Sequence, residues 1–252
     1  ARMTWCASGE VRSSGYRVAG GWSVPVAVPL ALPGETAPTT YWRIGAGIDM
    51  SGALQVVANT RYDLRAVRGV AGVWEPVSVI RSFNSTTPLN PYLAVGVNGH
   101  AVMAWLEPAI AGYQLWVAYH DGAVWSPPVI LEEDTGLVMG NPPSSPWIQI
   151  ALDNTGAAVL VWERIGQDVR AGRYRAGVWE TTVLTTTGTA PHLATNANGD
   201  VRVAWDAGSG EVWSRHFSGA QSWSAPVQLT DRTRLDTPII NIPLVELAPD
   251  GK

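Results

Sequence analysis

The sequence predicts an all-β fold, a five-bladed β-propeller with four antiparallel strands in each blade, closed by pairing of the N- and C-terminal strands. The first observation is a repeat in which a turn glycine is followed, six residues later, by Trp. Its copies occupy residues 51–58, 98–105, 155–162 and 198–205, and a fifth starts at 250 and continues at 1–5, with Ala58 replacing Trp in one copy. The second observation is the spacing of the turn glycines, which is 47, 57, 43 and 52 residues, and 53 across the chain ends. The repeat is therefore circular.

Each copy also has the same order of predicted strands. A short apolar strand precedes the glycine, as in 92–97 and 147–152, and Asn-Gly or Asp-Gly predicts a two-residue hairpin turn. A second strand ends at the Trp, and a third strand of alternating pattern follows a polar loop, as in 114–119. A fourth strand opens with Trp in every copy, and these residues are Trp22, Trp74, Trp125, Trp179 and Trp223. Prolines in this strand indicate that it is the outer edge strand, because proline has no backbone N–H to donate to a neighbouring strand.

We therefore expect one domain over 1–252, long enough to bury a core without a disulfide. The expected blades are 238–252 with 1–32, 38–82, 88–132, 145–187 and 190–230. Strand 244–247 should pair with strand 2–5 and complete one blade. The alternative is that 244–247 completes the blade of a neighbouring molecule, which would be a domain swap. The insertion 132–146 should overhang one face, as a functional loop or as a spacer.

Composition excludes several classes of partner. The net charge is −4, the pI is about 5.5 and no Lys/Arg cluster occurs, which argues against nucleic acid and anionic membranes. No apolar run approaches the roughly 18 residues that span a bilayer, so we expect no membrane insertion. We also expect no cofactor or metal, because Cys6 is alone and the four histidines lack metal-ligand spacing. Cys6 should pack as a small apolar group. Because the chain begins with Ala1, we expect that an upstream segment has been removed.

The repeat also resembles that of a known protein family. Asp/Asn-x-x-Gly, Trp six residues after the glycine, and then Trp-Ser-x-Pro-Val-x-Leu, as in 223–229, resemble the repeats of bacterial secreted and cell-surface proteins often labelled sialidase-like. The number of blades is similar to that of the tachylectin-type five-bladed lectins. The resemblance implies a secreted or cell-surface location, and it specifies a blade better than an activity.

Candidate binding residues are those that vary between copies, whereas the two regular Trp sets should fill the space between blades. Aromatic candidates lie on third strands or on the loops before them, and they are Trp116, Trp213, Tyr62, Tyr113 and Tyr174. Charged candidates follow the second-strand Trp or lie on third strands, and they are Glu163, Asp206, Arg170 and Arg215. An acid and a guanidinium fork beside an aromatic ring predict a sugar or carboxylate pocket between blades. Solvated or ion-paired surface charges are the alternative.

Few acids lie near the predicted innermost strands. Only Asp49, Asp153 and Glu246 do, and two of these stand at turns, where Asp often caps a hairpin. We therefore expect no catalytic residue. The sequence favours a non-catalytic, lectin-like module that binds carbohydrate through loops and interblade grooves, with a glycan or a surface protein as partner. The alternatives are a protein-interaction or assembly subunit of an extracellular structure and, least favoured, a glycoside hydrolase.

Overall fold

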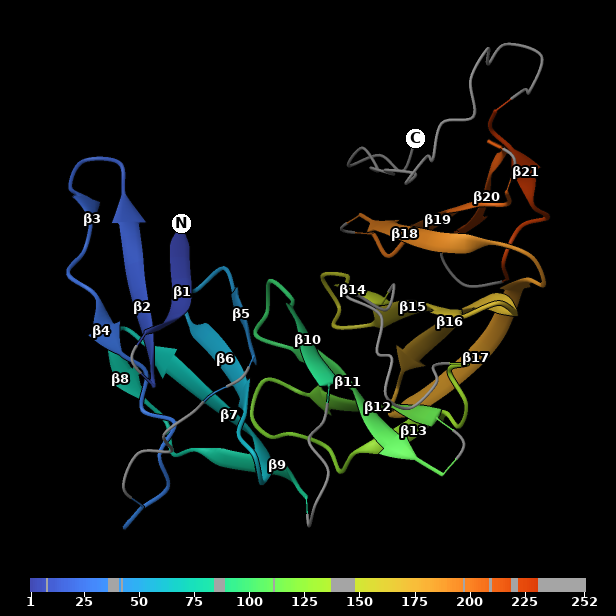
Figure 1. The fold of residues 1–252 in the computed structure, drawn as a ribbon. Helices are drawn as coiled ribbons and strands as arrows, with labels where there is room; N and C mark the ends of the chain where they lie inside the picture. The colour runs from blue at the N-terminus through green and yellow to red at the C-terminus, as the bar shows by residue number, and fades with distance from the viewer. Residues whose placement is uncertain are drawn as a thin grey trace. The chain divides into compact units, whose positions relative to one another are not determined.

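The computed structural model describes residues 1–7, 9–35, 41, 43–83, 89–110, 112–136, 148–196, 198–208, 210–218 and 222–230. These residues form strands and connecting loops without a helix, so the predicted all-β class is confirmed for them (Figure 1). In this part of the chain no helix is long and apolar enough to cross a membrane. The chain divides into two compact units, residues 1–108 with 116–129, and residues 109–115 with 130–252.

The strands form five antiparallel sheets. The first sheet contains β1 (Arg2–Ala7), β2 (Glu10–Arg17), β3 (Gly21–Trp22) and β4 (Val26–Ala27). The second contains β5 (Arg43–Ile48), β6 (Leu54–Asn59), β7 (Asp63–Val70), β8 (Val73–Trp74) and β9 (Ser78–Ser82). The third contains β10 (Leu89–Val95), β11 (Ala101–Ala109), β12 (Gly112–His120) and β13 (Val129–Glu132).

The last two sheets repeat this order. The fourth contains β14 (Ile148–Leu152), β15 (Ala158–Arg164), β16 (Asp168–Arg175) and β17 (Val178–Thr185). The fifth contains β18 (Thr189–Thr195), β19 (Val201–Asp206), β20 (Val212–Phe217) and β21 (Val227–Gln228). The first, second and third strands of each sheet pair in sequence order, and the outer strand pairs with the third, as predicted for each repeat. Five sheets fit five blades, but the predicted closing strand 244–247 lies outside the described residues, as do most of the insertion 132–146 and Glu246.

The outermost strand is interrupted in four sheets. In the first and second sheets its two pieces, β3 with β4 and β8 with β9, pair separately with the third strand. Trp125 and Trp223 form only isolated bridges before β13 and β21. In each of these four sheets proline stands between the Trp and the second piece, and proline cannot donate to the ladder. The fourth sheet has Thr181 and Thr182 there, and its outer strand β17 is continuous over eight residues.

The hairpin between the first and second strands is longer than predicted. A two-residue type I′ turn would need positive φ at both central residues, but Gly52 (φ 84°) has it and Ser51 does not. The N–H of Asp49 instead donates to the carbonyl of Ala53, and the N–H of Gly52 donates to the carbonyl of Asp49. This is the three-residue loop in which a type I turn is followed by a left-handed glycine. Real two-residue type I′ turns occur between the third and fourth strands, at Ala71-Gly72 and Ala176-Gly177.

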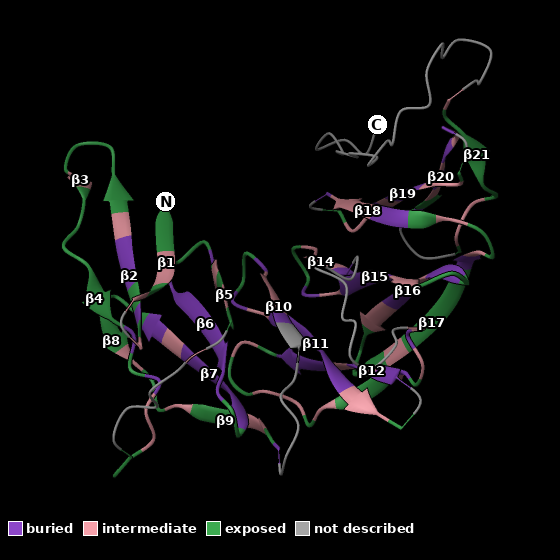
Figure 2. Ribbon diagram, in the orientation of Figure 1, coloured by how far each residue is buried: buried purple, intermediate pink, exposed green. Residues whose placement is uncertain are grey.

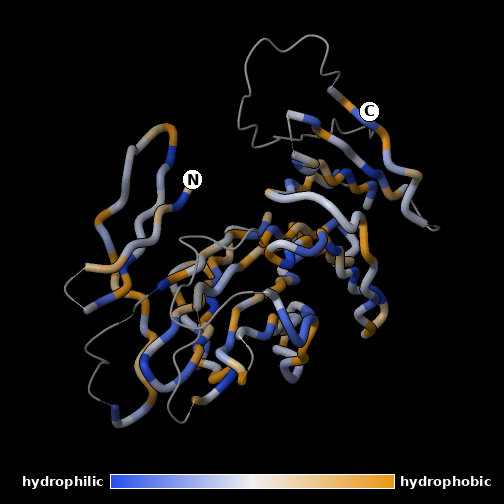
Figure 3. The backbone as a smooth tube through the Cα atoms, turned by 45° about the vertical axis from the view of Figure 1, so that its right-hand side comes forward, coloured by the Kyte–Doolittle hydropathy of each residue, from blue (hydrophilic) through white to orange (hydrophobic). Residues whose placement is uncertain are grey.

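The core lies between sheets that follow each other in the chain. Apolar clusters join the first sheet to the second and the second to the third in the first unit, and the fourth to the fifth in the second unit. Figure 2 shows the middle strands, such as β6 and β11, buried along most of their length, whereas β4 and β21 are exposed. Short hydrophobic and hydrophilic stretches alternate along the backbone (Figure 3).

The Trp residues of the second strands pack in this core, as predicted. Trp105, Trp162 and Trp205 are at most 2% exposed. The fourth-strand Trp residues pack on the end of the third strand, in the ring pairs Tyr16–Trp22, His120–Trp125, Tyr174–Trp179 and Phe217–Trp223. Three fourth-strand Trp residues also pack, partly buried, against the apolar clusters, namely Trp74, Trp125 and Trp223. The prediction that Cys6 packs as a small apolar group is wrong for the described residues, because Cys6 is exposed on β1.

Candidate functional site

Clusters of Arg and acid side chains recur where a sheet meets the one before it. The second-sheet cluster is formed by Asp63 and Arg65, at the start of β7, and by Glu35 from the chain before β5. The Nε and Nη2 atoms of Arg65 donate to the two carboxylate oxygens of Asp63, at 2.8 and 2.9 Å, and Nη1 and Nη2 donate to Glu35, at 2.6 and 2.9 Å. Nη1 also donates to the carbonyl of Leu30, at 2.9 Å. All five guanidinium N–H groups are thereby used.

Charge complementarity holds this cluster together. Hydrogen bonds from Arg65 are the largest cause that lowers the pKa of Glu35 from its ordinary 4.5 to about 2. Burial acts to lower the pKa of Arg65, but its hydrogen bonds to Glu35 and Asp63 outweigh burial and raise it. The Arg65 side chain is only 3% exposed. We therefore assign this cluster to the interior of the fold, because it offers no free donor to a ligand.

The third-sheet cluster is more open. Arg81, on β9, binds Glu107, on β11, through Nε and Nη2 at 3.1 Å each. The indole N–H of Trp105 donates to the same carboxylate at 2.8 Å. The guanidinium of Arg81 lies over the ring of Trp116, on β12, at 4.2 Å from its centroid, and Trp116 stacks on Trp105. The Arg81 side chain is 37% exposed and keeps three of its five N–H groups free of the described residues.

The fourth-sheet cluster combines two acids with two arginines. Arg170, on β16, donates from Nη1 to Glu132 at 2.8 Å, and from Nε and Nη2 to Asp168 at 3.1 and 3.2 Å. Arg164, on β15, donates to Asp168 at 3.3 Å and to the carbonyl of Asp134 at 3.0 Å. Two N–H groups of Arg170 have no acceptor among the described residues. Because the side chain of Arg170 is 24% exposed, a ligand can reach the edge of this cluster.

Sequence reasoning found Trp116 and Arg170 but not their partners Arg81, Glu107, Glu132, Arg164 and Asp168. A signal for these clusters is present in the chain. A polar residue, one apolar residue and then Arg or Trp begin every third strand, as 10–12, 63–65, 114–116, 168–170 and 211–213. In the register of the sheets the third residue of this motif lies opposite the Trp or Ala that ends the repeat, in the pairs Trp5–Arg12, Ala58–Arg65, Trp162–Arg170 and Trp205–Trp213. The motif therefore occupies one structural position.

The other aromatic candidates differ in exposure and in their partners. Trp213 is half-buried on β20, and its indole N–H donates to Glu211 at 3.3 Å. Tyr62 is 64% exposed in the loop before β7, with Arg61 beside its ring. Tyr174 packs against Trp179 on the outer edge of the fourth sheet, and Tyr113 is only 6% exposed.

The remaining charged candidates are each held by backbone groups. Glu163 accepts the N–H of Ala190 at 2.9 Å, and burial raises its pKa while this hydrogen bond lowers it. Asp206 accepts the N–H of Gly208 at 2.7 Å. Arg215 donates to the carbonyls of Ser224 and Leu184, at 2.6 and 3.1 Å, and burial lowers its pKa. Among the described residues, no side-chain hydrogen bond or ion pair joins any of these three residues to Trp116 or Arg170.

The acids near the innermost strands are used inside their own hairpins. Asp49 accepts the N–H of Ala53 at 2.9 Å and the hydroxyl of Ser51 at 2.6 Å. Asp153 does the same with Thr155 and with the N–H of Ala157, at 2.7 and 3.0 Å. Both are turn caps. Among the described residues no group of three or more His, Cys, Asp or Glu side chains is arranged to hold a metal ion.

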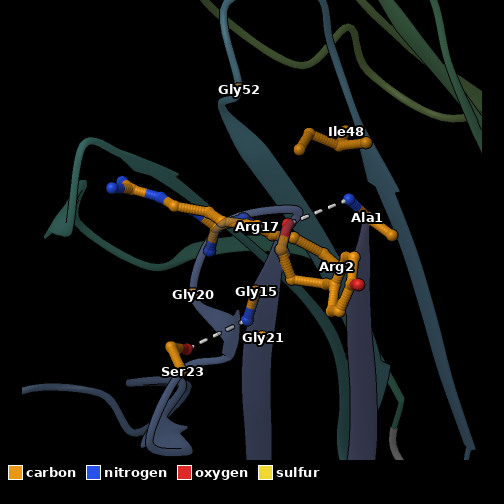
Figure 4. A pocket seen from close by; sticks show the side chains of 10 residues that line it. Ala1, Arg2, Gly15, Arg17, Gly20, Gly21, Ser23, Ile48 and Gly52 are labelled. Atoms are coloured by element: carbon orange, nitrogen blue, oxygen red, sulfur yellow. Dashed lines mark hydrogen bonds between the residues drawn. The ribbon is translucent and has the colours of Figure 1, made fainter.

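A pocket lies elsewhere, in the first unit. It has a volume of about 460 Å³ and is lined by Ala1, Arg2, Gly15, Tyr16, Arg17, Gly20, Gly21, Ser23, Ile48 and Gly52 (Figure 4). A second pocket of about 310 Å³ adjoins it and is lined by Arg2, Thr4, Ile44, Ala46, Gly47, Ile48 and Leu54. Both pockets flank strand β1. Their linings contain arginine but no acid.

Sequence comparison does not place the chain in a family, because no family model and no curated protein sequence matches it significantly. Its fold is similar to that of the BP39L lectin from Burkholderia pseudomallei, with a TM-score of 0.52 and 14% identity over 89% of this chain and 64% of the lectin. The lectin from Aleuria aurantia, described as a six-bladed β-propeller with a novel mode of fucose recognition, matches with a TM-score of 0.44 and 11% identity over 97% of this chain and 82% of the lectin. At such identities the likeness to BP39L shows the fold alone.

Proposed function

We propose that this chain is a non-catalytic, carbohydrate-binding module of the β-propeller type. The observation that carries the proposal is the pair of open Arg–acid clusters, the third-sheet cluster around Arg81 and the fourth-sheet cluster around Arg170. Lectins among the proteins of similar fold, such as BP39L, support the same class of ligand. Their identity to this chain is low, so the argument rests on the chemistry of the clusters.

Sugar hydroxyl groups suit these clusters because each hydroxyl both donates and accepts a hydrogen bond. The N–H groups of Arg81 and Arg170 that have no acceptor in the described part of the chain can donate to two neighbouring hydroxyl oxygens, as a planar guanidinium does with other paired oxygens. Carboxylates that already face the guanidinium, Glu107 and Glu132, can accept from the hydroxyls. The ring of Trp116 supports the third-sheet cluster from below, because the Arg81 guanidinium lies over it and is oriented by it.

The proposal includes a closed ring of five blades, with one blade built from both ends of the chain. It also places the protein outside the cell or on its surface, where glycans are displayed. The non-catalytic role is supported by how Asp49 and Asp153 are used, since hydrogen bonds within their own hairpins occupy them. A role as an assembly or protein-interaction subunit is the alternative that the following experiment separates.

The test is a glycan array with the purified chain, followed by calorimetric titration with the sugar that binds. We expect selective binding of one sugar class without hydrolysis of the sugar. Arg170→Lys should weaken binding at the fourth-sheet cluster, because the ammonium keeps the charge but loses the planar fork. Trp116→Ala should weaken binding at the third-sheet cluster, because the Arg81 guanidinium loses the ring over which it lies.

Arg12→Ala is the matched control for both variants. Arg12 lies at the same position of the repeat, but its ion pair with Glu10 is exposed, with side chains 45% and 50% accessible. Its removal should leave binding unchanged. A blank array with folded protein would remove the carbohydrate proposal and favour a protein partner. Binding that survives both Arg170→Lys and Trp116→Ala would move the site away from these clusters.

A further inference from the structure

The outer strand of the fourth sheet differs from the outer strands of the other sheets. Strand β17 is continuous over eight residues, whereas each outer piece elsewhere in the described sheets has at most five. It pairs with β16 on one side, and among the described residues no strand pairs with its other side. Figure 2 shows β17 exposed along most of its length. A long, unpaired edge of this kind can accept a further strand.

Proline closes the outer edges of the other sheets to such pairing. Residues 74–76 of the second sheet read Trp-Glu-Pro, and the corresponding residues 179–181 of the fourth sheet read Trp-Glu-Thr. The first, third and fifth sheets carry proline at 25, 127 and 226. Proline has no N–H to donate to an added strand, and β17 contains none. The fourth sheet is therefore the one whose outer edge remains suited to strand addition.

The phase of the ladder between β16 and β17 identifies the backbone groups at the open edge. Glu180 lies opposite Arg173. At the corresponding pair of the second sheet, the N–H of Glu75 donates to the carbonyl of Arg68 at 2.8 Å. The type I′ turn at 176–177 sets the same phase in the fourth sheet, because the pair that flanks a two-residue turn is hydrogen-bonded and such pairs recur at every second residue. Glu180 therefore directs its N–H and carbonyl to β16.

Alternation along the strand then assigns the neighbouring residues. The register of β17 on β16 is regular from 178 to 183. Thr182 directs its backbone groups to β16, as Glu180 does, whereas those of Trp179, Thr181 and Val183 point to the open edge. The side chains of Thr181 and Val183 are exposed, and that of Trp179 is half-buried. These three residues offer an added strand their N–H and carbonyl groups.

The side chains of β17 complement those of a second β17. With Thr181 of two antiparallel copies on a two-fold axis, the residues that point outward meet each other as hydrogen-bonded pairs. Thr181 then lies opposite Thr181 of the second copy, and Trp179 lies opposite Val183. Between these pairs, Glu180 lies opposite Thr182, whose hydroxyl can donate to the carboxylate. Thr–Thr pairs and pairs of an aromatic with a β-branched residue are favourable neighbours across strands.

The neighbouring registers fit less well. An axis at Glu180 would place two carboxylates directly opposite each other, and like charges in that position are destabilising. An axis at Thr182 would separate Trp179 from Val183 and place it opposite Thr185, beyond the regular part of the register. The axis at Thr181 is thus the one that both the charge and the packing favour.

We propose that β17 is a dimerisation edge, to which a second copy of this chain adds its own β17 in antiparallel orientation with Thr181 on the two-fold axis. Because both copies use the same edge, the pairing consumes it and the assembly closes at two chains. This inference goes beyond carbohydrate binding, since it uses none of the residues of the two open Arg–acid clusters except the strand β16 on which Arg170 lies.

The experiment is sedimentation velocity of the full-length chain over a range of concentrations, with Thr181→Pro beside the wild type. The substitution gives the fourth sheet the Trp-Glu-Pro sequence of the second sheet. It removes an N–H that points away from β16, so circular dichroism should show a folded chain. We expect a dimer fraction that rises with concentration in the wild type and a monomer in Thr181→Pro. A wild type that is monomeric throughout, or a dimer that persists in folded Thr181→Pro, would overturn the proposal.

Two variants of Thr182 test the register and leave the backbone unchanged. Thr182 is exposed and lies opposite Glu180 of the second copy in the proposed dimer. Thr182→Lys creates two cross-strand charge pairs and should tighten the dimer by about twofold or more at low salt, whereas Thr182→Glu should weaken it. Equal effects of the two variants would overturn the register, and no effect of either would overturn the edge. Neither measurement involves a sugar, so the outcome of the glycan array is independent of this test.

Discussion

Removing the guanidinium of Arg65 should destabilise the fold strongly. The substitution Arg65→Met keeps most of the apolar stem but leaves the carboxylates of Asp63, 10% exposed, and Glu35, 33% exposed, without their cation. Breaking a buried ion pair from one side costs about 3–5 kcal/mol. We take about 3 kcal/mol, because Glu35 regains water and Asp63 keeps the hydroxyl of Thr60 at 2.6 Å. At about 2–4 °C per kcal/mol for a chain of this size, the midpoint of thermal unfolding should fall by about 6–12 °C at pH 7.

The pH dependence gives the same prediction a second readout. The folded-state pKa of Glu35 is lowered to about 2, so the stability it contributes is present above pH 4.5 and is lost as the pH falls toward 2. The full shift would correspond to about 3 kcal/mol, and screening of a carboxylate that is one-third exposed reduces this to about 1–2 kcal/mol.

Calorimetry of the wild type, Arg65→Met and Arg65→Lys between pH 2.5 and 7 measures both effects. Arg65→Lys, which keeps the charge with fewer donors, should lie between the other two. The acid-induced loss should be smaller in Arg65→Met, because its Glu35 no longer has the ion pair to lose. A midpoint for Arg65→Met within about 2 °C of the wild type at pH 7 would refute the structural role of the second-sheet cluster.

Three further substitutions test other features of the fold. Ala176 has φ 51° in a type I′ turn, a left-handed conformation that Asn tolerates better than Ala. Ala176→Asn should therefore raise the free energy of unfolding by about 0.5–1 kcal/mol, and an unchanged denaturant midpoint would contradict this. Burial raises the pKa of Glu163, so ionisation removes stability as the pH rises through that pKa. Glu163→Gln, which still accepts the N–H of Ala190, should raise the thermal midpoint at pH 7 and lose this advantage near pH 4. Gly47→Ala would place a Cβ 2.5 Å from Cγ2 of Val95 and should lower the free energy of unfolding by about 1–3 kcal/mol. Adding Val95→Ala should recover part of this loss. Calorimetry that shows no loss for Gly47→Ala would contradict the packing argument.

Much of the fold could be predicted from the sequence because its signals are local. Alternation with period two, a left-handed glycine at each hairpin and a Trp at each strand end are all properties of neighbouring residues, and they predicted sheets of four antiparallel strands. The hairpin length was mistaken for a related reason. Asn98-Gly99 satisfies a three-residue loop, with positive φ only at the glycine, as well as the two-residue turn that the dipeptide favours.

The candidate site was harder to predict because its residues come from different sheets. Glu132 meets Arg170 across 38 positions of sequence, and Arg81 meets Glu107 across 26. No local sequence pattern shows that the last charged side chain of an outer strand contacts the next sheet. Trp116 and Arg170 could be found because the residue at their position varies between copies of the repeat, whereas most of their partners lie on outer strands or just beyond the second-strand Trp.

Equivalent positions in this repeat have come to differ in what they can bind. Arg65 and Arg170 occupy the same place on the third strand, yet among the described residues Arg65 uses all five of its N–H groups and Arg170 uses three. The difference arises from the preceding segment of chain. The carbonyl of Leu30 and both carboxylate oxygens of Glu35 accept from Arg65, whereas only Glu132 accepts from Arg170 in the corresponding place. The preceding sheet thus decides whether a third-strand arginine holds the fold together or remains open to a ligand. Under the carbohydrate proposal, counting blades would therefore overestimate the number of glycan sites. Counting the guanidinium N–H groups that lack an acceptor among the described residues at each junction predicts which junctions bind.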